Sequence, residues 1–163
     1  MNVDALRSRY LPKQVKLLFV GESPPQGGTF FYACNSHLFR YTKASFERTL
    51  ERSFNSDHAF LEYFTEQAFF LDDLCLQPVN GMKRSDRRRC CREGVAPLSK
   101  RIGHYKPQTL LITPMSIEAD VRQSLSQSGH RAAVIVLPFP ANGWQLVYQE
   151  KLSEFLRERK RDS

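Results

Sequence analysis

The chain has 163 residues, of which 24 are Lys or Arg and 17 are Asp or Glu, so its formal net charge is +7. This length predicts one domain spanning residues 1–163, and the positive charge favours polyanionic partners. The apolar runs are only as long as strands, and the N-terminus lacks a basic segment followed by an apolar one, which argues against a membrane span and a signal peptide. We therefore expect a cytoplasmic monomer without membrane contact.

The first half of the chain combines short apolar runs with amphipathic stretches. Gly and Pro interrupt the apolar runs, while Ser and Thr precede the amphipathic stretches as possible N-caps. In chain order we expect a helix over 3–10, a strand over 15–20, a helix from about Thr42 as its N-cap, a helix capped by Ser56, and a strand over 68–71.

The second half repeats the alternation of helix and strand. In chain order we expect a helix over 83–102, a strand over 109–113, a helix opened by Ser116 and ending near Gly129, a strand over 133–137, and an amphipathic helix from about Trp144. Four short apolar strands separated by helices predict a parallel sheet with helices on both faces. The fold class is therefore α/β, a three-layer sandwich around a four-stranded sheet.

The bend after the first strand is the first candidate site. It reads Gly21-Glu22-Ser23-Pro24-Pro25, in which Gly permits unusual φ values and the prolines hold a fixed path. Ligand sites in open α/β sheets lie at the carboxyl ends of strands. Glu22 is therefore a candidate functional carboxylate; the alternative is that it only accepts hydrogen bonds from amides of the turn.

Further aromatic and polar side chains follow the other strands and would meet at the same edge of the sheet. Rings stack on planar ligands, while carboxylates and amides read donor and acceptor edges. The alternatives are that the two phenylalanines belong to the core and that the tryptophan begins the apolar face of the last helix. The candidates besides the bend are Phe30, Phe31, Asp72, Asp73, Phe139, Asn142 and Trp144.

These motifs, in this order, resemble the uracil-DNA glycosylase superfamily. Gly21-Glu22-Ser23-Pro24 is similar to the motif after its first strand, in the Gly-Glu-Ala-Pro form of its thermostable prokaryotic branch. The stretch 28–31 resembles the segment holding the ring that stacks on the base. The stretch 70–78 is similar to the second-strand motif, and 137–142 falls where the last loop belongs. The resemblance implies a DNA glycosylase-like hydrolase that cleaves the N-glycosidic bond of a uracil-like, damaged or modified base.

Three positions depart from the family pattern. Ser23 stands where the best-known members have an Asp that orients water, and Phe139 stands where a His stabilises the departing base. Asp72 replaces the usual Asn, and an ionised carboxylate accepts hydrogen bonds but cannot donate them. Because a carboxylate accepts well from an exocyclic amine, the base is expected to differ from uracil.

The resemblance also assigns roles. Glu22, with Ser23 beside it, would act as general base or oxocarbenium stabiliser. Phe30 or Phe31 would stack on the flipped base and Asp72 would read its edge, with Phe139 and Asn142 completing the pocket. Trp144 or Asn142 would wedge into the stack. DNA, duplex or single-stranded, would contact the tail 157–161 and the cluster Lys83, Arg84, Arg87, Arg88 and Arg89. In a prokaryote the protein would be associated with the nucleoid.

The cysteines and histidines predict no cofactor. The family branch usually binds an iron–sulfur cluster through four cysteines, and Cys75 and Cys91 lie near two of those positions, but this chain has no C-x-x-C pair. The four histidines have no spacing typical of a metal site. We expect reduced thiols and no metal.

Two other functions stay open. The missing Asp and His fit a nucleic-acid-binding domain of the same fold that has lost catalysis. An enzyme acting on free nucleosides at the same sheet edge is the third hypothesis.

Overall fold

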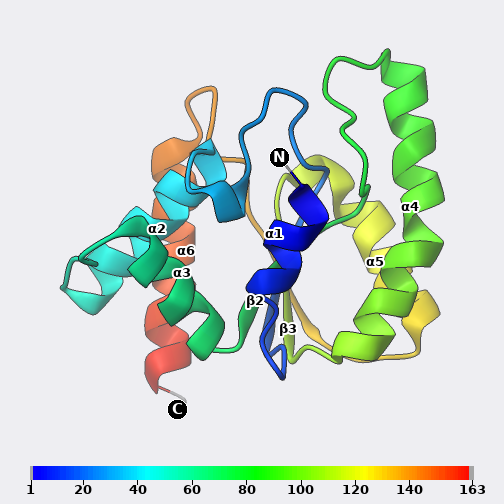
Figure 1. The fold of residues 1–163 in the computed structure, drawn as a ribbon. Coiled ribbons are helices and arrows are strands. Elements are labelled where there is room, and N and C mark those ends of the chain that lie inside the picture. The colour runs from blue at the N-terminus through cyan, green and yellow to red at the C-terminus, as the bar shows by residue number, and fades with distance from the viewer. Residues whose placement is uncertain (1, 162–163) are drawn as a thin grey trace.

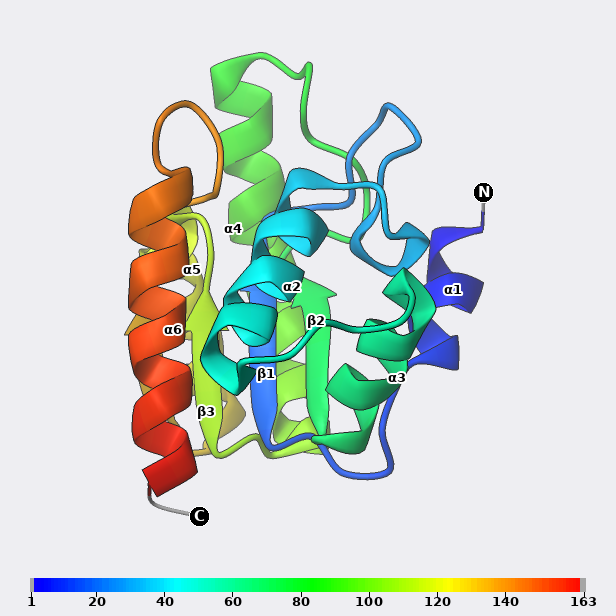
Figure 2. The same cartoon turned by 90° about the vertical axis from the view of Figure 1, so that its left-hand side faces the viewer.

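The computed structural model of the chain describes residues 2–161 and contains a four-stranded parallel sheet with helices on both faces (Figures 1 and 2). The strand order is β2-β1-β3-β4, and Gly21 pairs with Asp73 at the carboxyl end of the first two strands. The α/β three-layer prediction is confirmed. The strands are β1 (Leu17–Gly21), β2 (Phe69–Asp73), β3 (Thr109–Ile112) and β4 (Ala133–Val136).

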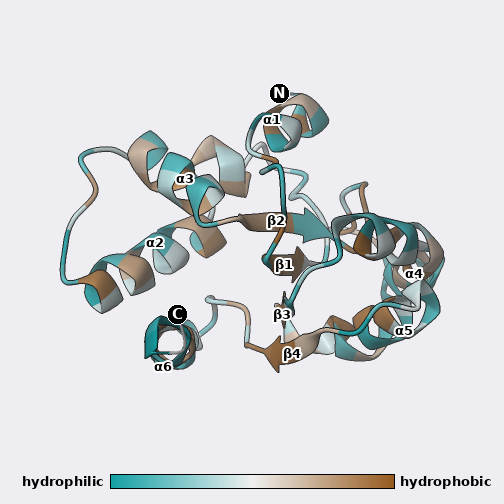
Figure 3. Cartoon of the chain, turned by 90° about the horizontal axis from the view of Figure 1, so that it is seen from below, coloured by the Kyte–Doolittle hydropathy of each residue, from teal (hydrophilic) through white to brown (hydrophobic). Residues whose placement is uncertain are grey.

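The helices divide between the two faces of the sheet. Seen along the strands, α2, α3 and α6 lie on one face, α4 and α5 lie on the other, and α1 lies beside β2 (Figure 3). The helices are α1 (Val3–Arg9), α2 (His37–Leu50), α3 (Asp57–Glu66), α4 (Arg84–Tyr105), α5 (Glu118–Ser128) and α6 (Gln145–Arg161), with short 3₁₀ turns at Phe31–Ala33 and Met115–Ile117.

The core is dense in aromatic rings on the side of α2 and α3. Every residue of β1, β2 and β3 is buried, whereas β4 is partly exposed. Phe64 lies with its ring centroid 5.3 Å from Phe19 and 5.6 Å from Phe69, in tilted and edge-on geometries that aromatic pairs prefer. This packing holds the sheet rigid beneath the loops at its carboxyl edge.

Two helix starts differ from the sequence prediction. The N-cap of α2 is Ser36, whose Oγ accepts from the Phe39 amide at 3.1 Å, so the prediction of Thr42 is wrong. Thr42 is instead buried within α2, where its hydroxyl shares a 2.7 Å hydrogen bond with Tyr148 of α6. Ser116 lies in the 3₁₀ turn that precedes α5 rather than capping it. Ser56 caps α3 as predicted.

Among the helices that the structure describes, none is both long and apolar enough to cross a lipid bilayer.

Candidate functional site

A cavity of about 490 Å³ opens at the carboxyl edge of the sheet. The Gly21–Pro25 bend forms one side, and the end of β2 with the start of α2 forms another. Its volume lies in the range of pockets that hold small organic ligands. Of the candidate residues from the sequence, the cavity lining contains Glu22, Ser23, Phe30, Phe31, Asp73, Arg87 and Phe139.

Glu22 lies in the cavity with both carboxylate oxygens engaged. Arg87 of α4 donates from Nε to Oε1 at 2.7 Å and from a terminal nitrogen to Oε2, which makes a bidentate pair. The thiol of Cys91, one helical turn further along α4, lies 3.8 Å from the same Oε1. The Glu22 side chain is 15% exposed, whereas the Arg87 side chain is 45% exposed, so only the carboxylate half of the pair is shielded from bulk water.

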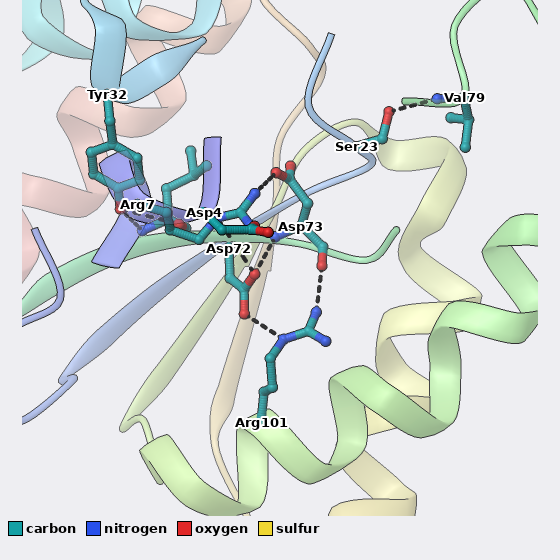
Figure 4. Close-up of polar contacts among 9 residues, drawn as sticks. Asp4, Arg7, Ser23, Tyr32, Asp72, Asp73, Val79 and Arg101 are labelled. Carbon is teal, nitrogen blue, oxygen red and sulfur yellow. Dashed lines mark hydrogen bonds and ion pairs between the residues drawn. The ribbon is translucent and has the colours of Figure 1, made fainter. Parts of the chain in front are cut away.

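Ser23 has a positional role in the structure. Its Oγ accepts from the Val79 amide at 3.2 Å, which ties the bend after β1 to the loop after β2 (Figure 4). A second tie runs between the same two loops, since the Gln26 amide donates to Asn80 Oδ1 at 2.9 Å. The two ties hold the bend and its carboxylate over the end of the sheet.

Phe30 and Phe31 line the cavity and are also part of the core, since each is only 2% exposed. Phe31 packs edge-on against Tyr32 and Phe39, while the Arg7 guanidinium lies 5.4 Å from the centroid of the Phe30 ring. The alternative that these rings belong to the core therefore holds, and they line the cavity as well; stacking on a ligand stays a prediction. Rings that are fixed by packing offer a ligand a preorganised apolar wall.

Asp72 does not line the cavity. Its Oδ2 accepts from Arg101 Nε at 2.7 Å and its Oδ1 accepts from the Asp73 amide at 2.8 Å (Figure 4). The expectation that Asp72 faces the pocket placed it on the wrong side of the strand. Successive side chains of a strand point to opposite faces, so the neighbouring Asp73 is the carboxylate that reaches the cavity.

Asp73 is held in place from two directions. Its Oδ2 accepts from Arg7 of α1 at 2.5 Å, and its Oδ1 lies so close to Gly21 that a Cβ at this position would collide with it. The motif glycine therefore leaves room for the carboxylate of the adjacent strand. Within residues 2–161, Oδ1 has no hydrogen-bond partner.

The electrostatic surroundings of Asp73 suit proton exchange. Burial raises the pKa of this carboxyl to about 7; Arg7 opposes the rise and the charge of Asp72 adds to it. Near neutral pH the group therefore populates both protonation states, and it can accept a hydrogen bond from a ligand or donate one.

The loop after β4 lies at the rim. Phe139 is 38% exposed and reaches the cavity, but Asn142 and Trp144 line a separate, shallower depression of about 240 Å³ beside it. The expectation that Asn142 joins the pocket is not met, since Asn142, whose φ is 53°, lines only this second depression. Trp144 is 48% exposed just before α6, and its predicted DNA contact stays a prediction.

The basic cluster of α4 borders a second hollow, which we call the arginine groove. This groove of about 400 Å³ is lined by Glu22, Arg84, Arg87, Arg88, Cys91, Ser116 and Ile117. Arg88 pairs with buried Asp120, and Arg89 pairs with Asp86 at 2.8 Å on the exposed side of the helix. Lys83 and Arg84 form no ion pair with the described residues.

Sequence reasoning missed three contributors. His37, the first residue of α2, lines the cavity, and the Ser36 cap before it was the signal that would have placed it there. Asn80 lines the cavity from the loop after β2. Arg7 carried no signal, because nothing local to α1 shows that its guanidinium is buried against β2.

The four cysteines are free thiols, with 3.9 Å between the sulfur atoms of Cys75 and Cys91. Within residues 2–161, no group of three or more His, Cys, Asp or Glu side chains is arranged to hold a metal ion.

Comparison with models of known protein families and with curated protein sequences finds no match.

Proposed function

We propose that this chain is a DNA glycosylase-like hydrolase that takes an unstacked base into the cavity at the carboxyl edge of the sheet. The observation that carries the proposal is the composition of this cavity. Two fixed phenylalanine rings, the carboxylates Glu22 and Asp73 and the neighbouring arginine groove lie together. The resemblance of the Gly21–Pro24 motif to uracil-DNA glycosylases supports the same function. DNA is then the partner, in the cytoplasm or nucleoid.

Recognition of the base is assigned to the rings and Asp73. A base is planar and apolar on its faces, so Phe30 or Phe31 provides a stacking surface. The open Oδ1 of Asp73 accepts from an exocyclic amine when ionised, and the protonated acid donates to a carbonyl or ring nitrogen. Asp73 thus takes the role that the sequence assigned to Asp72. A base with an amine at its edge, or a damaged or modified base, fits this carboxyl.

The reaction is cleavage of the bond between the sugar C1′ and the base nitrogen. The bond breaks with its electron pair leaving on the base, and the oxocarbenium ion at C1′ is stabilised by the negative charge of Glu22. A water adds to C1′ and passes its proton to Glu22, which gives an abasic sugar, and the departing base anion takes up a proton to become the free base.

Base release from oligonucleotides tests the proposal. Duplex and single-stranded oligonucleotides that carry a panel of altered bases are incubated with the protein, and abasic sites are cleaved with alkali. We expect strand scission for at least one base and a loss of about 10²–10⁴-fold in rate for Glu22→Gln. Glu93→Gln, an exposed carboxylate on α4, serves as the matched control and should keep the parental rate. No scission across the panel, or an active Glu22→Gln, rules the activity out.

A specific observation favours one other function, nucleic-acid binding without catalysis. Both Glu22 and Ser23, the two predicted catalytic side chains, are engaged by Arg87 and the Val79 amide. A binding domain would retain salt-sensitive affinity for oligonucleotides and release no base from any of them.

A further inference from the structure

Arg87 lies where two hollows of the molecule meet. Its side chain lines both the cavity at the carboxyl edge of the sheet and the arginine groove. Glu22, to which it is bound, also lines both. The two residues are 65 positions apart in the chain, so the contact is made by the docking of α4 against the bend after β1. Any ligand that fills both hollows meets this pair.

In this structure Arg87 occupies the Glu22 carboxylate that the proposed reaction uses as a base. Both of its oxygens accept from Arg87, and the Cys91 sulfur lies 3.8 Å from Oε1. The guanidinium thus occupies one acceptor site on each oxygen, which leaves fewer sites to take a proton from water.

The arginine groove offers Arg87 another anionic partner. Arg84, Arg87 and Arg88 stand at spacings of three and four residues along α4, which places them on one side of the helix. The Arg87 and Arg88 side chains are 45% and 47% exposed, and Arg84 has no ion-pair partner among the described residues. Guanidinium groups bind phosphate oxygens in the bidentate geometry that they use for carboxylates, so a phosphate in the groove competes with Glu22 for Arg87.

We propose that Arg87 is a latch: a phosphate group held by Arg84 in the arginine groove, beside the Arg88–Asp120 pair, draws the Arg87 guanidinium away from Glu22 and frees the carboxylate. Arg87 is thus a positioning residue that acts through Glu22. The ligand chemistry is a phosphate ester, either a diester of a nucleic-acid backbone or a terminal monoester. The consequence for catalysis rests on the proposed function, but the competition between phosphate and Glu22 does not.

Phosphate affinity tests the latch without any need for catalysis. Inorganic phosphate is titrated by calorimetry into the full chain, Glu22→Gln, Arg87→Ala and the double variant. Because Glu22→Gln removes the competing charge, we expect phosphate to bind about fivefold more tightly. In the Arg87→Ala background the same substitution should change the affinity by less than about twofold, since the competition requires Arg87. Arg89→Ala is the matched control: this arginine pairs with Asp86 outside the groove and should leave the affinity unchanged.

A measurement on the unaltered protein avoids the risk that a variant fails to fold. The Arg87 Nε–H proton is held by Glu22, so its NMR resonance should move when phosphate is added. Thymidine 5′-monophosphate and the dinucleotide TpT then separate the two sources, because the first is a monoester and the second carries only a diester. The ester whose affinity rises about fivefold in Glu22→Gln identifies the class of phosphate that the groove binds. The latch is overturned if the Arg87 Nε–H resonance does not move on addition of phosphate. It is also overturned if Glu22→Gln still raises the phosphate affinity in the Arg87→Ala background. Failure of base release in the glycosylase assay leaves these results unaffected.

Discussion

Asp72 and Asp73 are adjacent in sequence and yet have different surroundings. Asp72 is 1% exposed and bound to Arg101, whereas Asp73 faces the cavity with one oxygen on Arg7 and the other beside Gly21. The pleat of β2 separates them onto opposite faces of the strand. Gly21 and Asp73 are partners in the register of β1 and β2, so the motif glycine and the cavity carboxylate form one structural unit.

The raised pKa of Asp73 predicts a pH dependence of stability. Burial holds this pKa at about 7 in the folded protein against 3.8 for the ordinary group. Between these two pH values the Asp73 carboxyl therefore keeps its proton in the folded state but has lost it in the unfolded state. The stabilisation that Asp73 gives to the folded state is fully present below about pH 4 and is lost as the pH rises through about 7. We expect the free energy of unfolding of the parent, minus that of Asp73→Asn, to fall between pH 4 and 7 in urea titrations. Glu93→Gln, at an exposed carboxylate without an ion pair among the described residues, is the control and should show no such fall. A flat curve for Asp73→Asn would contradict the assignment.

Helix α1 has only seven residues, but its Arg7 holds the buried carboxylates at the end of β2. Arg7 is 6% exposed and reaches Asp73 at 2.5 Å and Asp72 at 3.9 Å, and its guanidinium also lies over the Phe30 ring. From the other face of the sheet, Arg101 of α4 binds the Asp72 carboxylate and the Asp73 carbonyl (Figure 4). The two arginines neutralise a pair of buried carboxylates and so join two helices to the end of β2.

Removal of Arg7 is expected to be costly. Arg7→Ala leaves buried carboxylate charge uncompensated, for which we expect a loss of about 3–5 kcal/mol in the free energy of unfolding. Chemical denaturation at pH 7 measures the loss, and Arg9→Ala, an exposed arginine on the same helix, is the control with an expected change below about 0.5 kcal/mol. Equal stability of the two variants would show that the buried cluster does not need Arg7.

At the scale of the whole molecule, the basic residues occupy two separate regions. The cluster at the start of α4 borders the cavity, whereas α6 begins beside the loop after β4 and carries its basic residues to the opposite end of the sheet (Figures 1 and 2). The sequence analysis expected DNA to contact both the tail 157–161 and the cluster on α4. The structure places the two at opposite ends, so a short nucleic acid in the cavity contacts only the first.

This separation predicts which arginines determine the salt dependence of binding. Each phosphate contact contributes about 0.7 to the slope of log K against log salt for single strands. Arg84→Ala should therefore lower the slope by about 0.7 in fluorescence anisotropy titrations of a short single-stranded oligonucleotide. Arg161→Ala removes an equal charge at the far end of the molecule and should leave the slope unchanged. Equal effects of the two substitutions would mean that charge acts without regard to position.

Local sequence patterns predicted the fold class correctly and pointed to the sheet edge at which the cavity opens. Short apolar runs bounded by Gly and Pro are local signals, and they correctly placed the four strands, the bend after β1 and its Glu22. The tertiary structure alone decided that Asp73 rather than Asp72 faces the cavity, that Arg7 holds it, and that Arg87 closes on Glu22. These contacts join residues 65 or 66 positions apart. They depend on which strands pair and on how α1 and α4 dock, and neither is visible within any one segment of the sequence.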